Sequence, residues 1–172
     1  MCYKILTKET RCHICAIGFE PIICLLPETS ANSILVQSLD KRWWDTTYTF
    51  HIADREMIVS THDFHRMFGL RCDRKIINLR GASSVDIGIE LLRRRYSMDT
   101  ICYYDTKMEY RPLSSLTPDD YAQMARAFLL DILGEYLFAN GGQMVSLRWL
   151  SLFYFFEEAW EANWGQVCLA YL

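Results

Sequence analysis

The residues best suited to binding a metal ion lie near the N-terminus, where the sequence Cys-His-Ile-Cys occupies positions 12–15 and Cys24 follows. A structural zinc ion needs four ligands that converge tetrahedrally, usually as two closely spaced pairs on turns. A second pair is missing here, and the intervening residues are apolar. We therefore interpret these cysteines as buried or incidental thiols and predict no metal site.

A second cluster, His-Asp-Phe-His at positions 62–65, has the residue types of an acid–base or metal site, with His51 and Glu56 upstream. On a helix His62 and His65 share a face while Asp63 points elsewhere, so three ligands would not converge. Asp63 also follows Ser60 by three residues, which is the position of a capping-box acid. Its role at a helix start is therefore the preferred interpretation, and we expect neither catalytic residues nor metal ligands here.

Motifs of the common enzyme classes are absent from the sequence. It contains no G-x-S-x-G nucleophile elbow, no phosphate-binding G-x-x-x-x-G-K-[ST] loop and no dinucleotide-binding G-x-G-x-x-G turn. The five lysines occupy polar settings, unlike the desolvated amine of a Schiff-base enzyme. We predict no cofactor and do not expect enzymatic activity.

Tryptophans in two segments are the candidate contacts for a protein partner, because large aromatic side chains dominate binding hot spots. Packing inside the domain is nevertheless the default interpretation, since an indole supplies much apolar area and needs only one partner for its N–H. The candidates are Arg42, Trp43, Trp44, Trp160 and Trp164.

Basic residues gather between positions 41 and 95, although the whole chain has a formal net charge of −3. This imbalance is modest for a nucleic-acid-binding surface, and a solvated protein surface explains most of it. The three arginines at 93–95 would also complement the negative end of a helix dipole. The candidate nucleic-acid contacts are Arg66, Arg71, Arg74, Lys75, Arg80, Arg93, Arg94 and Arg95.

The 172 residues, 51% of them hydrophobic and 23% charged, predict one folded domain and exclude a disordered tail. Seven cysteines without regular spacing, and an N-terminus unlike a secretory signal, favour a reducing compartment. The longest apolar run, 147–156, is about half the length that a bilayer needs. We expect a soluble intracellular protein without a membrane segment.

The elements that would position these residues are mainly helical. Residues 1–17 are predicted to be irregular, and 47–52 and 56–60 alternate as one β-hairpin. Helices are predicted over 60–69, 84–96, 147–159 and 164–172, with Gly165 at a close backbone approach. Thr117 and Pro118 begin the strongest pattern, an amphipathic helix to Phe138. We predict a single helical domain around this central helix, with one small β-hairpin.

Two blocks of residues resemble the plant mobile domain, a family also described as aminotransferase-like and MAIN-like. Arg42 to His51, Glu56 to Ser60 and Asp63 to Leu70 resemble its opening signature. Arg126 to Phe138 and Trp164 to Leu172 resemble its central and closing helices. The similarity covers 18–172, and the chain's end inside an apolar segment predicts a domain truncated at its C-terminus.

The resemblance implies a nuclear, transposon-related plant protein that acts in meristem maintenance, genome stability and transposon silencing through protein partners. A nuclear phosphatase-like protein or a silencing factor would be such a partner. We therefore predict a non-enzymatic interaction module. DNA binding is the alternative, and a pyridoxal-phosphate-dependent aminotransferase is the third hypothesis. The oligomeric state is not predicted.

Overall fold

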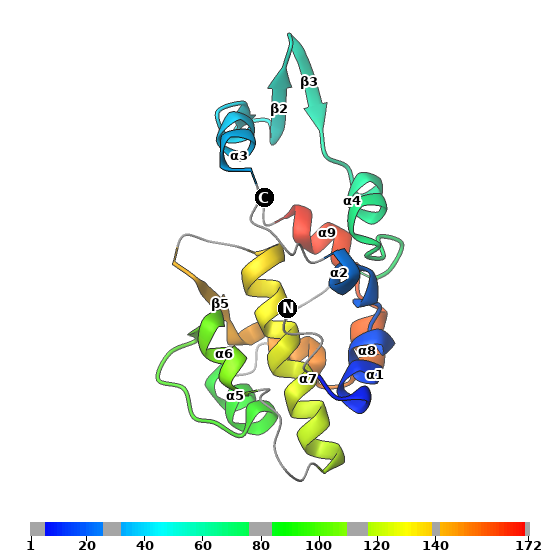
Figure 1. The fold of residues 1–172 in the computed structure, drawn as a ribbon, viewed down its shortest axis with the longest axis vertical. Helices are drawn as coiled ribbons and strands as arrows, with labels where there is room; N and C mark the ends of the chain where they lie inside the picture. Colours follow the sequence, from blue (N-terminus) through cyan, green and yellow to red (C-terminus); the bar gives the residue numbers. More distant parts are fainter. Residues whose placement is uncertain (1–5, 26–31, 76–83, 110–116, 139–141, 171–172) are drawn as a thin grey trace.

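A computed structural model describes residues 6–25, 32–75, 84–109, 117–138 and 142–170, and most of them are helical (Figure 1). The α-helices are α1 (Lys8–Ala16), α2 (Glu20–Leu25), α3 (Ser33–Asp40), α4 (Thr61–Phe68), α5 (Ser84–Leu92), α6 (Tyr103–Glu109), α7 (Pro118–Ile132), α8 (Phe156–Trp160) and α9 (Trp164–Leu169). The strands are β1 (Trp43–Trp44), β2 (Thr49–Ile52), β3 (Arg55–Ile58), β4 (Thr100–Cys102) and β5 (Met144–Ser146). The prediction of a mainly helical fold is confirmed.

Helix α7 lies at the centre of the body, as predicted. Thr117 and Asp120 form a capping box, in which each side chain accepts a hydrogen bond from the other residue's backbone N–H. All side chains from Met124 to Ile132 are buried except that of Arg126. Helix α1 covers one side of α7, and α5 and α6 cover the other (Figure 1). The helix continues as a π-helical turn, Leu133–Leu137.

The N-terminal segment is more regular than predicted. Residues Lys8–Ala16 form α1, whose N-cap is the Thr7 hydroxyl, and Thr10 and Ile14 are buried. The prediction of an irregular segment over 1–17 is therefore wrong for this helix. Its pattern was too sparse to identify because few of its side chains enter the core.

Two predicted helices are shorter than expected. Helix α5 ends at Leu92, and Arg93 has φ +53, so the three arginines lie beyond the helix. The predicted helix over 147–159 is divided into a 3₁₀ helix, Leu147–Phe153, and the short α8. Arg126 accounts for this break, because its guanidinium donates to the carbonyl oxygens of Phe153 and Tyr154.

The strands of the described residues form two sheets, so the prediction of one hairpin is incomplete. In the first sheet β1, β2 and β3 are antiparallel neighbours, and β2 and β3 are the predicted hairpin. Its turn residues Ala53 and Asp54 both have positive φ, as a tight two-residue hairpin turn requires. The second sheet pairs β4 with β5, in the register Thr100–Ser146. No local pattern reveals a pairing between segments so distant in sequence.

Helix α4 begins and ends where the sequence predicts. Ser60 and Asp63 form its capping box, and Gly69 ends it with φ +70, a conformation that a residue without a Cβ adopts at little cost. Upstream of α4, helix α3 and the β2–β3 hairpin project from one end of the body (Figure 1). Among the described residues, no helix combines the length and the apolar character needed to cross a bilayer.

Candidate protein-interaction surface

Helix α3 is exposed along its whole length. The Asn32 side chain begins it by accepting hydrogen bonds from the N–H groups of Ile34 and Leu35, and the Arg42 guanidinium donates to the Ser38 carbonyl near its other end. None of its residues is buried, although Ile34, Leu35 and Val36 are apolar and 74%, 59% and 51% exposed. The spacing of Leu35, Val36 and Leu39 places them on one side of a short helix, but such a stripe does not distinguish a core from an interface.

An apolar groove of about 320 Å³ lies between α3 and the first sheet. Val36, Leu39 and Asp40 line it from the helix, and Trp43 and Phe50 line it from the sheet. The Trp43 and Phe50 rings meet at an angle of 61°, with centroids 4.8 Å apart. Of the predicted partner contacts, Trp43 therefore forms part of the groove wall, and Arg42 precedes it directly in the chain.

The other face of this sheet holds Trp44 in a fixed orientation. Its ring stacks on His51 with centroids 4.1 Å apart, yet the residue is 53% exposed. His51 lies within a polar network around the buried Thr49, whose hydroxyl donates to the Glu56 carboxylate at 2.9 Å and is 3.2 Å from the His51 ring. The network therefore orders a side chain that remains available to a partner.

The C-terminal tryptophans, Trp160 and Trp164, belong to α8 and α9 and do not lie beside α3 and the first sheet. Trp164 is only 1% exposed, packs against Phe19 and Phe153, and donates its indole N–H to the Ala159 carbonyl at 2.9 Å. Its prediction as a partner contact is therefore wrong, because the core satisfies both its apolar ring and its N–H. Trp160 is half-buried beneath the Arg71 guanidinium, 4.5 Å from the ring centroid. It belongs to α8, which lies well away from α3 (Figure 1).

The predicted close approach at Gly165 is confirmed. A Cβ at this position would overlap the Cys72 Sγ, and the Gly165 N–H donates to the Arg71 carbonyl at 3.2 Å. The segment after α4 thus packs directly on the start of α9.

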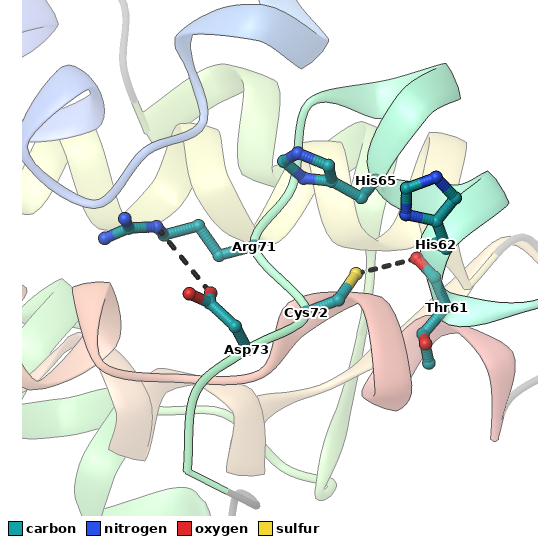
Figure 2. A pocket seen from close by; sticks show the side chains of 6 residues that line it. All are labelled: Thr61, His62, His65, Arg71, Cys72 and Asp73. Carbon is teal, nitrogen blue, oxygen red and sulfur yellow. Dashed lines mark hydrogen bonds and ion pairs between the residues drawn. The ribbon is translucent and has the colours of Figure 1, made fainter.

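A polar pocket of about 430 Å³ lies beside α4 and this segment (Figure 2). The Cys72 thiol at its edge donates to the Thr61 carbonyl at 2.9 Å, and partial burial raises the pKa of the thiol. A protonated, hydrogen-bonded thiol is a poor nucleophile. The lining residues are Thr61, His62, His65, Arg71, Cys72 and Asp73.

The two sequence clusters considered for metal binding are not assembled into a site, and Asp63 has a structural role instead. The Asp63 carboxylate accepts hydrogen bonds from the Ser60 hydroxyl and N–H, which lower its pKa. Cys12 and Cys24 are exposed free thiols on separate helices. Within the described part of the chain, no three His, Cys, Asp or Glu side chains could hold a metal ion together. The described lysine side chains, those of Lys8, Lys41 and Lys75, are all exposed, unlike the desolvated amine of a Schiff-base enzyme.

The candidate nucleic-acid contacts divide into two groups. Arg66, Arg71, Arg74 and Lys75 lie on α4 or the segment after it, and Arg74 pairs with Glu161 at 3.5 Å. The second group follows α5, in a different part of the body (Figure 1).

In this second group Arg93 pairs with Asp120 at 2.9 Å, and Arg94 lies over the Tyr96 ring. Arg95 is exposed, and Arg80 lies outside the described residues. The described candidates do not form one continuous face.

Comparisons with known proteins identify the family. Residues 2–172 match the family model described as "Domain of unknown function (DUF8566)". The chain is 28% identical to Protein MAIN-LIKE 2 of Arabidopsis thaliana over 86% of the chain and 23% of that protein. It is 28% identical to Protein MAINTENANCE OF MERISTEMS of the same plant, over 97% of the chain and 37% of that protein.

It is also 24% identical to Protein MAIN-LIKE 1 of Arabidopsis thaliana, over 83% of the chain and 30% of that protein. The chain thus spans between about a quarter and about two fifths of the length of these relatives. No solved structure matches it. The chain belongs to the DUF8566 family, and its homologues are the MAIN-like plant proteins.

Proposed function

We propose that this chain is a non-enzymatic protein-interaction module of a MAIN-like plant protein, and that it binds through one apolar surface. We define the α3–hairpin surface as the side chains of Ile34, Leu35, Val36, Leu39, Trp43 and Met57, which leaves out Trp44 because it lies on the opposite face of the sheet. The observation that carries the proposal is the exposure of α3, which has no buried residue despite four large aliphatic side chains.

Apolar side chains gathered on one projecting module are unfavourable in water and become favourable when a partner covers them. Trp43 adds an aromatic wall whose orientation is already fixed by packing on Phe50, so binding would cost little side-chain entropy. The groove beside Trp43 offers a recess for a partner's side chain. Rigid aromatic groups beside an apolar recess are the usual composition of a hot spot.

The biological setting is also a proposal. The resemblance to the plant mobile domain supports a nuclear, transposon-related protein, with a phosphatase-like or silencing factor as partner. The name of one relative, MAINTENANCE OF MERISTEMS, supports a role in meristem maintenance. Fluorescence microscopy of the tagged chain in plant cells tests the nuclear location, and exclusion from the nucleus would contradict it.

Capture from a plant nuclear extract tests the interaction. Leu35→Glu places a charge on the α3–hairpin surface, and Met98→Glu is its matched control, since Met98 is exposed to the same 59% and lies on the body. Proteins bound by the wild type and the control but lost from Leu35→Glu are then purified and titrated directly. Equal binding by all three chains would contradict the proposed surface.

Direct DNA binding is the second candidate, supported by the four cations on α4 and the segment after it. If these residues contact phosphates, affinity for duplex DNA falls steeply with salt, and Arg66→Ala or Lys75→Ala reduces the slope by about one. Fluorescence anisotropy at several salt concentrations measures this slope. Affinity that is absent, or unchanged by salt, would exclude this candidate.

A further inference from the structure

We propose that the occupant of the α3–hairpin surface is the same surface of a second copy of this chain, with the two α3 helices antiparallel about a twofold axis. This inference rests on the proposed function and names its partner. A twofold interface must be self-complementary, because each contact occurs twice with the roles of the copies exchanged. Two properties of the surface, its shape and its charge, meet this requirement, and a third, its size, sets the strength of the pairing.

The first property is shape. Ile34 and Leu35 protrude from α3, with exposed fractions of 74% and 59%, and neither lines the groove. Val36 on the helix and Trp43 on the sheet give the groove two apolar walls, and Asp40 lines it at the C-terminal end of α3. One module thus presents both a protrusion and a recess of the same apolar chemistry. In a twofold pair, the protrusion of each copy can fill the recess of the other.

The second property is charge. From Ser33 to Leu39 the helix carries no charged residue, so antiparallel packing buries no charge at the centre of the interface. Asp40 lies at the C-terminal end, where the helix dipole disfavours an anion. In an antiparallel pair it would lie beside the positive N-terminal end of the partner helix. Lys41 and Arg42 follow Asp40 and already offset part of this cost, and the pairing would add a favourable contact for Asp40 twice in each dimer.

The third property is size. At roughly 200 Å² for a fully exposed large side chain, the exposed fractions of Ile34, Leu35, Val36, Leu39 and Met57 correspond to about 550 Å² in each copy. If all of this area were covered, two copies would bury about 1,100 Å² through these residues, just below the range of about 1,200–2,000 Å² for stable specific interfaces. We therefore expect a weak dimer, with a dissociation constant in the micromolar range.

Sedimentation equilibrium of the full chain from about 5 to 500 µM tests the proposal. We expect the wild type and the Met98→Glu control to dimerise alike and Leu35→Glu to remain monomeric. Asp40→Lys should weaken the dimer about tenfold, because each copy would place a cation beside the partner's positive helix end. The same lysine suits the negative end of its own helix, so the melting temperature of the monomer should not fall. If Asp40 only stabilised the folded chain, Asp40→Lys would instead lower the melting temperature of the monomer.

The outcomes distinguish this inference from the proposed function. A wild-type chain that stays monomeric throughout overturns the second copy as occupant, as does a dimer that Leu35→Glu leaves intact. If the chain is monomeric but the nuclear-extract experiment still yields a partner lost from Leu35→Glu, the proposed function stands and only this inference fails. If the chain is monomeric and no such partner is found, both fail.

Discussion

Helices α7 and α3 both carry runs of large aliphatic side chains, but they use them differently. In α7, Leu129 and Leu130 have no exposed surface, whereas Ile34 of α3 is 74% exposed. The body is assembled by contacts between segments distant in sequence, with α1, α5 and α6 all packed on α7. The projecting sheet depends instead on local contacts, mainly between neighbouring strands and around Thr49. The comparison separates side chains that hold the fold from side chains that are free to bind.

The tryptophans show the same division. Trp164 and Trp44 have the same side chain and were both predicted as partner contacts, yet one is 1% exposed and the other 53%. The difference lies in the partner of the indole ring. Trp164 packs between aromatic rings inside the body, while Trp44 stacks on one face of His51. Substitutions at matched positions can therefore test the division directly.

The largest effect is expected from Trp164→Ala, which should lower the free energy of unfolding by about 3–5 kcal/mol because it removes a buried indole and leaves a cavity. Trp44→Ala should cost less than about 1 kcal/mol, because about half of the residue already lies in water. Urea denaturation measures both. Equal losses of stability in the two variants would show that the sheet is as integral to the fold as the body.

The next effect concerns the contact between α9 and the segment after α4. Gly165→Ala should destabilise the chain by about 1–3 kcal/mol, because the new methyl group overlaps the Cys72 Sγ. Adding Cys72→Ala, which removes that sulfur, should recover part of the loss. Thermal melting of the single and double variants measures the coupling. Strictly additive losses would mean that another contact causes the effect.

Local signals in the sequence were sufficient for the elements whose ends are fixed by neighbouring residues. The capping boxes of α4 and α7 each require two residues three positions apart, and the hairpin requires a short alternating pattern. These elements were predicted close to their observed limits. The candidate contacts Trp43 and Trp44 are adjacent in sequence, but the alternation of a strand sends them to opposite faces, so only Trp43 lines the groove.

Features that depend on distant contacts could not be predicted in the same way. Strand β4 pairs with β5, which lies far away in the chain. The break after Phe153 likewise depends on a distant residue, Arg126. The exposure of α3 is a related case, since its apolar stripe is what a core helix would also show. Packing inside the domain was the default interpretation of the tryptophans, but the sequence could not tell that Trp164 would be buried and Trp44 exposed, because this depends on the distant aromatic rings that pack on Trp164.

A smaller effect is expected from the helix caps as the pH falls. Hydrogen bonds from Thr117 lower the pKa of Asp120 below its ordinary value of 3.8 in the folded chain. A depressed carboxyl pKa contributes stability above the unfolded value, and this contribution is lost as the pH falls through the folded value. Stability should therefore decline below about pH 4. Asp120→Asn should lower stability at neutral pH and flatten this part of the profile, which urea titrations between pH 2 and 7 would show. An unchanged acid profile would assign the decline to other carboxyl groups.

The smallest effect on stability, and the sharpest test of the comparison, is expected from Ile34→Ser. Ile34 contributes little to the folded chain because most of its surface remains in water, so the free energy of unfolding should change by less than about 0.5 kcal/mol. Binding should respond much more strongly, because the same side chain is buried only when a partner covers α3. Leu129→Ser is the opposite case, since its fully buried position predicts a severe loss of stability. If chemical denaturation showed Ile34→Ser to be strongly destabilising, α3 would belong to the fold and the distinction between the two helices would fail.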